Sequence, residues 1–170
     1  MKLLKAVALA VPGLLLAVLA SAMVMRLTNG ARLLDPFLIV VVAQATRGRR
    51  SEAMAVGAVA GIVQDMLSSV DFGVHYLSKL VVGYVASLVA TSLIPGQPLT
   101  AAVLLAGGTI LEVIVQMLCG VLLGQHFNTP GLGELAVEVV ANVAVGLVVF
   151  AVIDRFRQKR PRQVMHARGR

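Results

Sequence analysis

Charge is scarce in this chain. Only 14% of its 170 residues are Asp, Glu, Lys or Arg, against about 25% in soluble domains. Residues 154–170 hold eight of these 23 charges, which leaves 15 for the first 153 residues. So few charges cannot cover the surface of a soluble domain. Because 58% of the residues are hydrophobic and the mean hydropathy is +0.90, disorder is excluded and a small polytopic α-helical membrane protein is predicted.

Aromatic residues and cysteine are also few. The aromatic share is 4% and tryptophan is absent, which excludes a core built on large aromatic side chains. The single cysteine, Cys119, excludes an internal disulfide and a cysteine-based metal site. The P-loop, H-E-x-x-H and G-x-S-x-G patterns are missing. We therefore expect a protein that is not an enzyme, with no catalytic residue, metal or cofactor.

Six apolar segments stand out along the chain. In lipid every backbone amide must be hydrogen-bonded internally, so such segments predict helices. They form one expected transmembrane helical domain, 1–153, followed by a basic tail over 154–170. The predicted spans are Leu3–Met25, Leu33–Thr46, Ala53–Val70, Phe72–Ile94, Leu99–Phe127 and Glu134–Ile153.

The second segment is short. Its 14 residues reach about 21 Å as a helix, less than a hydrocarbon core of about 30 Å. A re-entrant or interfacial segment is the alternative to a span. The basic residues favour six spans, because 12 of the 15 lysines and arginines then lie on one side, which the positive-inside rule assigns to the cytoplasm. Both termini would be cytoplasmic, as would Arg47, Arg49, Arg50, Arg155, Arg157, Lys159 and Arg160.

The beginning of the chain has a second interpretation. Lys2 and Lys5, an apolar stretch and then Ala20-Ser21-Ala22 are similar to a signal peptide with its cleavage site. Cleavage would leave five helices and an external N-terminus. Because the apolar stretch is long enough to span, we expect it to remain as the first helix.

Polar side chains interrupt the later segments, and such residues usually face the interior of a helix bundle. His75 and Lys79 share one helix face, as do Glu112 and Gln116. We expect Asp65 or Glu138 to pair with Lys79. The pair either fixes only the register of the helices, or belongs to a polar pocket, a partner-binding patch or an ion path. The candidate residues are Asp65, His75, Lys79, Glu112, Glu138 and Asn142, with Gln64 and Glu134 nearby.

Two further features predict contacts. The spacing Gly57-x-x-x-Gly61 allows two helix backbones to approach closely. The tail from Arg155 to Arg170 has seven basic residues and no acidic one, so we expect it to bind anionic lipid headgroups, with a cytoplasmic partner as the alternative. Nucleic-acid binding is not expected, because no aromatic residues are interleaved with the charges.

One stretch is more specific than composition. It runs from Leu34-Asp35-Pro36-Phe37-Leu38 through Gly61-Ile62-Val63-Gln64-Asp65-Met66-Leu67-Ser68 to Phe72-Gly73-Val74-His75-Tyr76-Leu77 and Gly83-Tyr84. This order resembles MreD, the rod-shape-determining membrane protein family of bacteria, over about residues 33–90. The chain departs from the family pattern at Asp35-Pro36, where the reverse order is usual, at Val70-Asp71 and at Lys79.

The resemblance implies a function. It implies a non-enzymatic scaffold of the cell-wall elongation complex in the bacterial inner membrane, without a small-molecule substrate. Its partners would be MreC and, through it, MreB and the SEDS glycosyltransferase–transpeptidase pair. The implied fold is similar to the S component of energy-coupling-factor transporters, so a ligand-binding subunit of such a transporter is the alternative. The residues carried over for the turn and for helix packing are Gly57, Gly61, Gly73 and Gly83.

Overall fold

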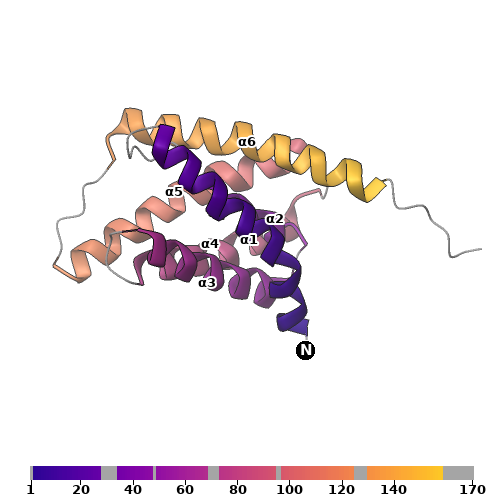
Figure 1. Cartoon of the computed structure of the whole chain (residues 1–170), viewed down its shortest axis with the longest axis horizontal. Coiled ribbons are helices and arrows are strands. Elements are labelled where there is room, and N and C mark those ends of the chain that lie inside the picture. The colour runs from indigo at the N-terminus through magenta and orange to yellow at the C-terminus, as the bar shows by residue number, and fades with distance from the viewer. Residues whose placement is uncertain are drawn as a thin grey trace, which may run out of the picture.

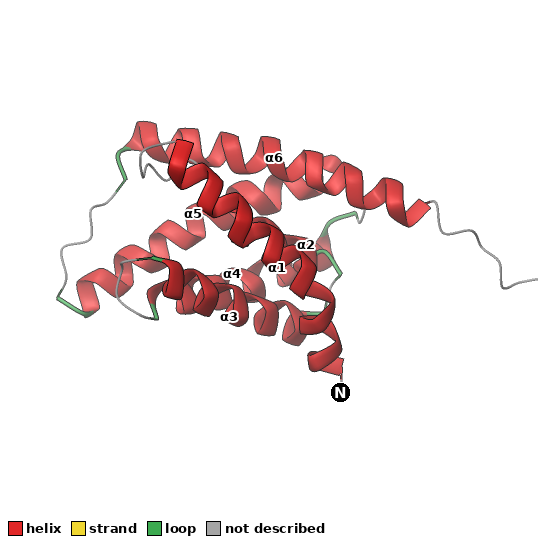
Figure 2. Ribbon diagram, in the orientation of Figure 1, coloured by secondary structure: helices red, strands yellow, loops and turns green. Residues whose placement is uncertain are grey.

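The computed structural model describes residues 2–27, 34–47, 49–68, 73–94, 97–124 and 130–158. Over these ranges the chain forms six α-helices and no strand (Figures 1 and 2). The predicted all-α class is therefore confirmed. The helices are α1 (Lys2–Leu27), α2 (Pro36–Ala45), α3 (Arg50–Leu67), α4 (Val74–Ser92), α5 (Pro98–Leu122) and α6 (Leu132–Gln158).

The helix ends differ from the predicted segments where local chemistry decides them. α2 begins only at Pro36, because Asp35 caps it and proline fits the first helical position. α4 begins after Gly73, whose φ of 107° suits glycine. α6 continues to Gln158, so the first residues of the predicted tail are helical. The predicted ends at residues 69–70 and 125–127 lie outside the described ranges.

Three helical stretches are long and apolar enough to cross a membrane, namely Val74–Ser92, Pro98–Leu122 and Leu132–Arg155. Ala10–Met23, within α1, and α2 are shorter apolar stretches. α3 has 18 residues but carries several charged side chains. The described part of the chain thus has three candidate membrane spans, which is consistent with a membrane protein.

The short helix α2 occupies the centre of the bundle and contacts each of the other five helices. Phe37, Leu38, Val41, Val42 and Ala45 on α2 are each at most 1% exposed. Because neighbouring helices surround α2, its ten residues need not match the thickness of a bilayer to be shielded from lipid. The predicted short segment is therefore a core helix within the bundle.

α3 and α4 pack backbone against backbone. A Cβ atom added to Gly61 would lie 2.5 Å from the carbonyl oxygen of His75, and one added to Gly83 would lie 2.6 Å from that of Ala53. Gly57 likewise faces the backbone carbonyl of Lys79. Side chains at these three positions would clash with main-chain atoms, so glycine sets the distance between the two helices.

The helices alternate in direction, which gives the bundle two distinct ends. The C-terminal ends of α2, α4 and α6 meet the N-terminal end of α5 around a common cavity. The starts of α2 and α4 meet the end of α3 at the other end of the molecule. In Figure 1, α6 runs along the upper edge, and α3 and α4 lie together below it. The arginines that follow α2 and Arg155 near the end of α6 therefore belong to one basic end.

Candidate functional site

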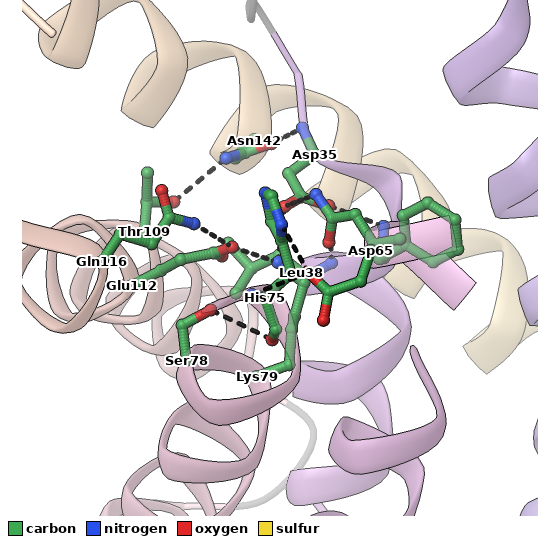
Figure 3. A network of polar contacts seen from close by, with 12 residues as sticks. Asp35, Leu38, Asp65, His75, Ser78, Lys79, Thr109, Glu112, Gln116 and Asn142 are labelled. Carbon is green, nitrogen blue, oxygen red and sulfur yellow. Dashed lines mark hydrogen bonds and ion pairs between the residues drawn. The ribbon is translucent and has the colours of Figure 1, made fainter. Parts of the chain in front are cut away.

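Lys79 is the centre of a buried polar network (Figure 3). It lies on α4, five residues after the first residue of that helix, and is 0% exposed. Its Nζ atom donates to Asp35 Oδ2 at 2.5 Å and also to Glu112 Oε1. One ammonium group thus joins the start of α2, the body of α4 and the middle of α5. Two buried carboxylates supply the opposite charge that a buried lysine requires.

Asp35 carries out two tasks at once. Its Oδ1 atom accepts hydrogen bonds from the backbone amides of Phe37 at 2.9 Å and Leu38 at 3.1 Å, which caps α2. Its Oδ2 atom accepts from Lys79 and from Gln64 Nε2 on α3, the latter at 3.1 Å. The carboxylate therefore fixes the start of α2 against both α3 and α4.

Glu112 extends the network along α5, and Asn142 connects it to α6. Glu112 Oε1 accepts from Gln116 Nε2 at 3.0 Å, one turn further on. Asn142 Nδ2 donates to Thr109 Oγ1 at 3.0 Å, while Asn142 Oδ1 accepts from the backbone amide of Asp35 at 2.8 Å. Asn142 is 0% exposed, and its amide uses both a donor and an acceptor. The contacts of Asn142 place α6 beside α5 and the start of α2.

Asp65 forms a second centre, at the turn between α3 and α4. Its Oδ2 atom accepts from the backbone amides of Gly73 at 2.9 Å and Tyr76 at 3.1 Å. Its Oδ1 atom accepts from the backbone amide of His75 at 3.0 Å and lies 2.9 Å from His75 Nδ1. Because a carboxylate can only accept, Nδ1 of His75 carries the proton in this contact. Asp65 on α3 thus caps the start of α4, where a negative charge also suits the helix dipole.

Of the two partners predicted for Lys79, Asp65 is wrong. Lys79 pairs with Asp35 and Glu112, whereas Asp65 binds the start of α4. Lys79 lies farther along α4 than the amides that Asp65 caps, and it faces the other carboxylates.

The structure brings most of the predicted polar residues into one connected region (Figure 3). Asp65 and His75 hold the turn, and Lys79, Glu112 and Asn142 cross the bundle. Glu138 is half-buried on α6, one turn before Asn142, and it has an interaction of its own. Glu134 is exposed in the first turn of α6, where its carboxylate accepts from the Gly131 amide at 3.1 Å.

The predicted basic residues lie away from this network. Arg47, Arg49 and Arg50 are exposed around the start of α3, and Arg155 is exposed near the end of α6. Arg49 Nη1 donates to Glu52 at 2.6 Å, and Glu52 also accepts from the buried Gln44 at 3.4 Å. The Arg157 side chain and the residues Lys159 and Arg160 lie outside the described part of the structure.

Besides Ser78 and Gln116, two members of the network were not among the predicted site residues. Asp35 is one, and the Asp-Pro pair before an apolar run is a signal for a helix cap. Thr109 is the other, and nothing in the sequence distinguishes it from a threonine that bonds only to its own helix. Its hydroxyl does donate to the Leu105 carbonyl at 2.9 Å, but its oxygen also accepts from Asn142.

The contacts of the network hold the helices together. Lys79, Asp35, Glu112 and Asp65 are each occupied by other groups of the protein, and each is less than 9% exposed. Within the described ranges, no group of His, Cys, Asp and Glu side chains is arranged to hold a metal ion. Mutually satisfied buried charges of this kind fix which helix faces meet and in which register.

Comparisons with protein-family models, with curated proteins and with solved structures find no match to this chain.

Proposed function

We propose that this chain is an MreD-like scaffold of the bacterial cell-wall elongation complex. It would bind MreC in the inner membrane and, through MreC, act on MreB and the SEDS glycosyltransferase–transpeptidase pair. In this proposal all six helices cross the membrane, both termini are cytoplasmic, and the fold is similar to the S component of energy-coupling-factor transporters.

One observation carries the proposal. The residues on which the MreD resemblance rests are far apart in sequence but serve one structural unit. Asp35, although its order with Pro36 departs from the family pattern, caps α2 and accepts from Gln64 on α3. Gly61 lets α3 touch α4, and Asp65 caps α4 through Gly73 and His75. An apolar composition alone would not be expected to place these residues in contact with one another. This interdependence supports the resemblance as more than shared hydropathy.

The charge distribution supports the proposed orientation. Arg47 and Asp154 line the same cavity, so the loop after α2 and the end of α6 lie at one end of the bundle. The arginines that follow α2, and Arg155 near the end of α6, therefore lie at one end of the bundle, as expected for a cytoplasmic surface. The position of α2 in the core supports a crossing by a helix of only ten residues, because protein rather than lipid surrounds it.

Depletion of the chain in its native bacterium tests the proposed function. Loss of rod shape, with rounding that an added wild-type copy reverses, is the expected result. Unchanged shape together with loss of uptake of one solute would contradict the scaffold and favour the transporter alternative. The variant Gly107→Ala is a control, because Gly107 is exposed and an added methyl group there meets no atom within 4 Å.

A further inference from the structure

A cavity of about 510 Å³ lies at the basic end of the bundle, away from the Lys79 network. Asp35 marks the start of α2, whereas the cavity is lined by residues at the opposite end of that helix, from Ala43 to Arg47. Its volume is in the range of about 300–1,000 Å³ that is typical of small-ligand sites. None of the residues of the buried network lines it.

The cavity exists because four helices each contribute an alanine where they meet. These residues are Ala43 on α2, Ala90 on α4, Ala101 on α5 and Ala151 on α6. Longer apolar side chains on α6, Leu147, Phe150 and Ile153, complete the wall. Larger residues at the alanine positions would fill the space. The wall is therefore suited to an apolar group.

The hydroxyl groups in the wall are already used. Thr46 Oγ1 donates to the Ala43 carbonyl at 2.9 Å, and Thr100 Oγ1 donates to the Ile94 carbonyl at 2.8 Å. Their protons are consequently not available to a polar solute in the cavity. Of the lining residues only Gln97 carries an amide side chain, and Gln97 is exposed, so the wall offers few hydrogen-bond donors to a ligand rich in hydroxyl or amide groups.

Charge gathers where the cavity meets the surface. Arg47 and Asp154 both line the cavity, and Arg47 is exposed and has an interaction within the protein. Around them, residues 43–52 and 147–155 hold four arginines and two carboxylates, and one of those carboxylates, Glu52, is paired with Arg49. The surface around the cavity is therefore positive overall. An apolar wall below a basic surface matches an amphiphile with an anionic head.

We propose that this cavity binds one anionic phospholipid from the membrane leaflet that faces the basic end. An acyl chain lies among the four alanines, and the phosphate lies next to Arg47. Asp154 opposes the phosphate and keeps it on the Arg47 side. This site is independent of the proposed scaffold function and of the Lys79 network.

Native mass spectrometry of the full chain tests the proposal. The chain is reconstituted in nanodiscs with equal amounts of phosphatidylglycerol and phosphatidylcholine and is then released into mild detergent. The wild-type chain should retain one lipid, preferentially phosphatidylglycerol. Ala101→Leu should lose most of the retained lipid of both kinds, whereas Ala144→Leu, an exposed position on α6 outside the cavity, should behave as wild type.

Two charge variants test the headgroup assignment, and they keep the test valid if Ala101→Leu fails to fold. Arg47→Gln should reduce the preference for phosphatidylglycerol about fivefold, as expected for loss of one arginine near an anionic headgroup. Asp154→Asn should increase the preference. Equal lipid retention by Ala101→Leu and Ala144→Leu, no change of preference in either charge variant, or a retained peptide in place of lipid would each overturn the proposal.

Discussion

Lys79 Nζ and Asp35 Oδ2 lie 2.5 Å apart, although 44 residues separate them in the sequence. The Lys79 side chain is 0% exposed and the Asp35 side chain 8% exposed. Neither charge can return to water without separating α2 from α4. The ion pair between the two side chains therefore fixes the position of the central helix α2 along the α3–α4 pair.

Removal of the lysine charge should be costly. Lys79→Met leaves Asp35 and Glu112 buried without their common cation, and breaking a buried pair in this way costs about 3–5 kcal/mol. The free energy of unfolding in detergent, followed by circular dichroism, should fall by about this amount. The triple variant Lys79→Met, Asp35→Asn, Glu112→Gln should regain part of the loss. A single variant as stable as the wild type would show that the lysine is not held as described.

The two tasks of Asp35 can be separated. Asparagine is also a good helix cap, so Asp35→Asn removes the charge but keeps the cap. Asp35→Ala removes both and should be less stable than Asp35→Asn by a further amount of about 1 kcal/mol. Either change combined with Lys79→Met should be less than additive, with a coupling of about 0.5–3 kcal/mol. Full additivity of the changes in unfolding free energy would show that Asp35 and Lys79 do not stabilise the fold as a pair.

Asp65 should control the start of α4. Asp65→Ala leaves the amides of Gly73, His75 and Tyr76 without their acceptor, and loss of a helix cap typically costs about 1 kcal/mol. Amide hydrogen exchange by mass spectrometry should show faster exchange over residues 73–76. Exchange in the middle of α5 is the internal reference. Unchanged protection at the start of α4 would contradict the assigned role.

Two glycine positions form a matched pair for helix packing. Gly61→Ala places a methyl group against the His75 backbone, so α3 and α4 must separate and the thermal unfolding temperature should fall. Gly107→Ala meets no atom within 4 Å, and alanine favours a helix over glycine by about 1 kcal/mol, so this variant should be slightly more stable. Similar effects of the two changes would contradict the close contact of α3 with α4.

Labelling tests the proposed orientation of the helices. In a Cys119→Ala background, one cysteine is introduced at Ser51, at the start of α3, or at Gly131, just before α6; both positions are exposed. A membrane-impermeant maleimide added to intact spheroplasts should label Gly131→Cys but not Ser51→Cys until the membrane is opened. Labelling of both cysteines, or of Ser51→Cys alone, in intact cells would exclude cytoplasmic placement of the basic end.

The sequence was sufficient to predict the helical class, because apolar runs of this length leave the backbone few alternatives in lipid. The sequence also marked the polar residues, since Lys79 and Glu112 are conspicuous in apolar helices. Periodicity within one helix describes that helix alone. It does not say which helices become neighbours, so Asp65 or Glu138 was expected beside Lys79, where Asp35 and Glu112 are found.

Asp35 and Thr109 were difficult to recognise for related reasons. An aspartate before Pro36 is fully explained as a helix cap, and a threonine in a helix is explained by a bond to its own backbone. Each residue has a second contact that only the tertiary arrangement creates, with Lys79 for Asp35 and with Asn142 for Thr109. A local role can therefore conceal a long-range one.

The most direct test of the scaffold is purification of the tagged chain from its native bacterium in mild detergent, with identification of all co-purifying proteins. The account predicts recovery of MreC together with wall-synthesis proteins, and weaker recovery when Lys79→Met loosens the bundle. Gly107→Ala, at an exposed and open position, should recover MreC as well as the wild-type chain does. Recovery of transporter ATPases and a coupling subunit in place of MreC would contradict the account.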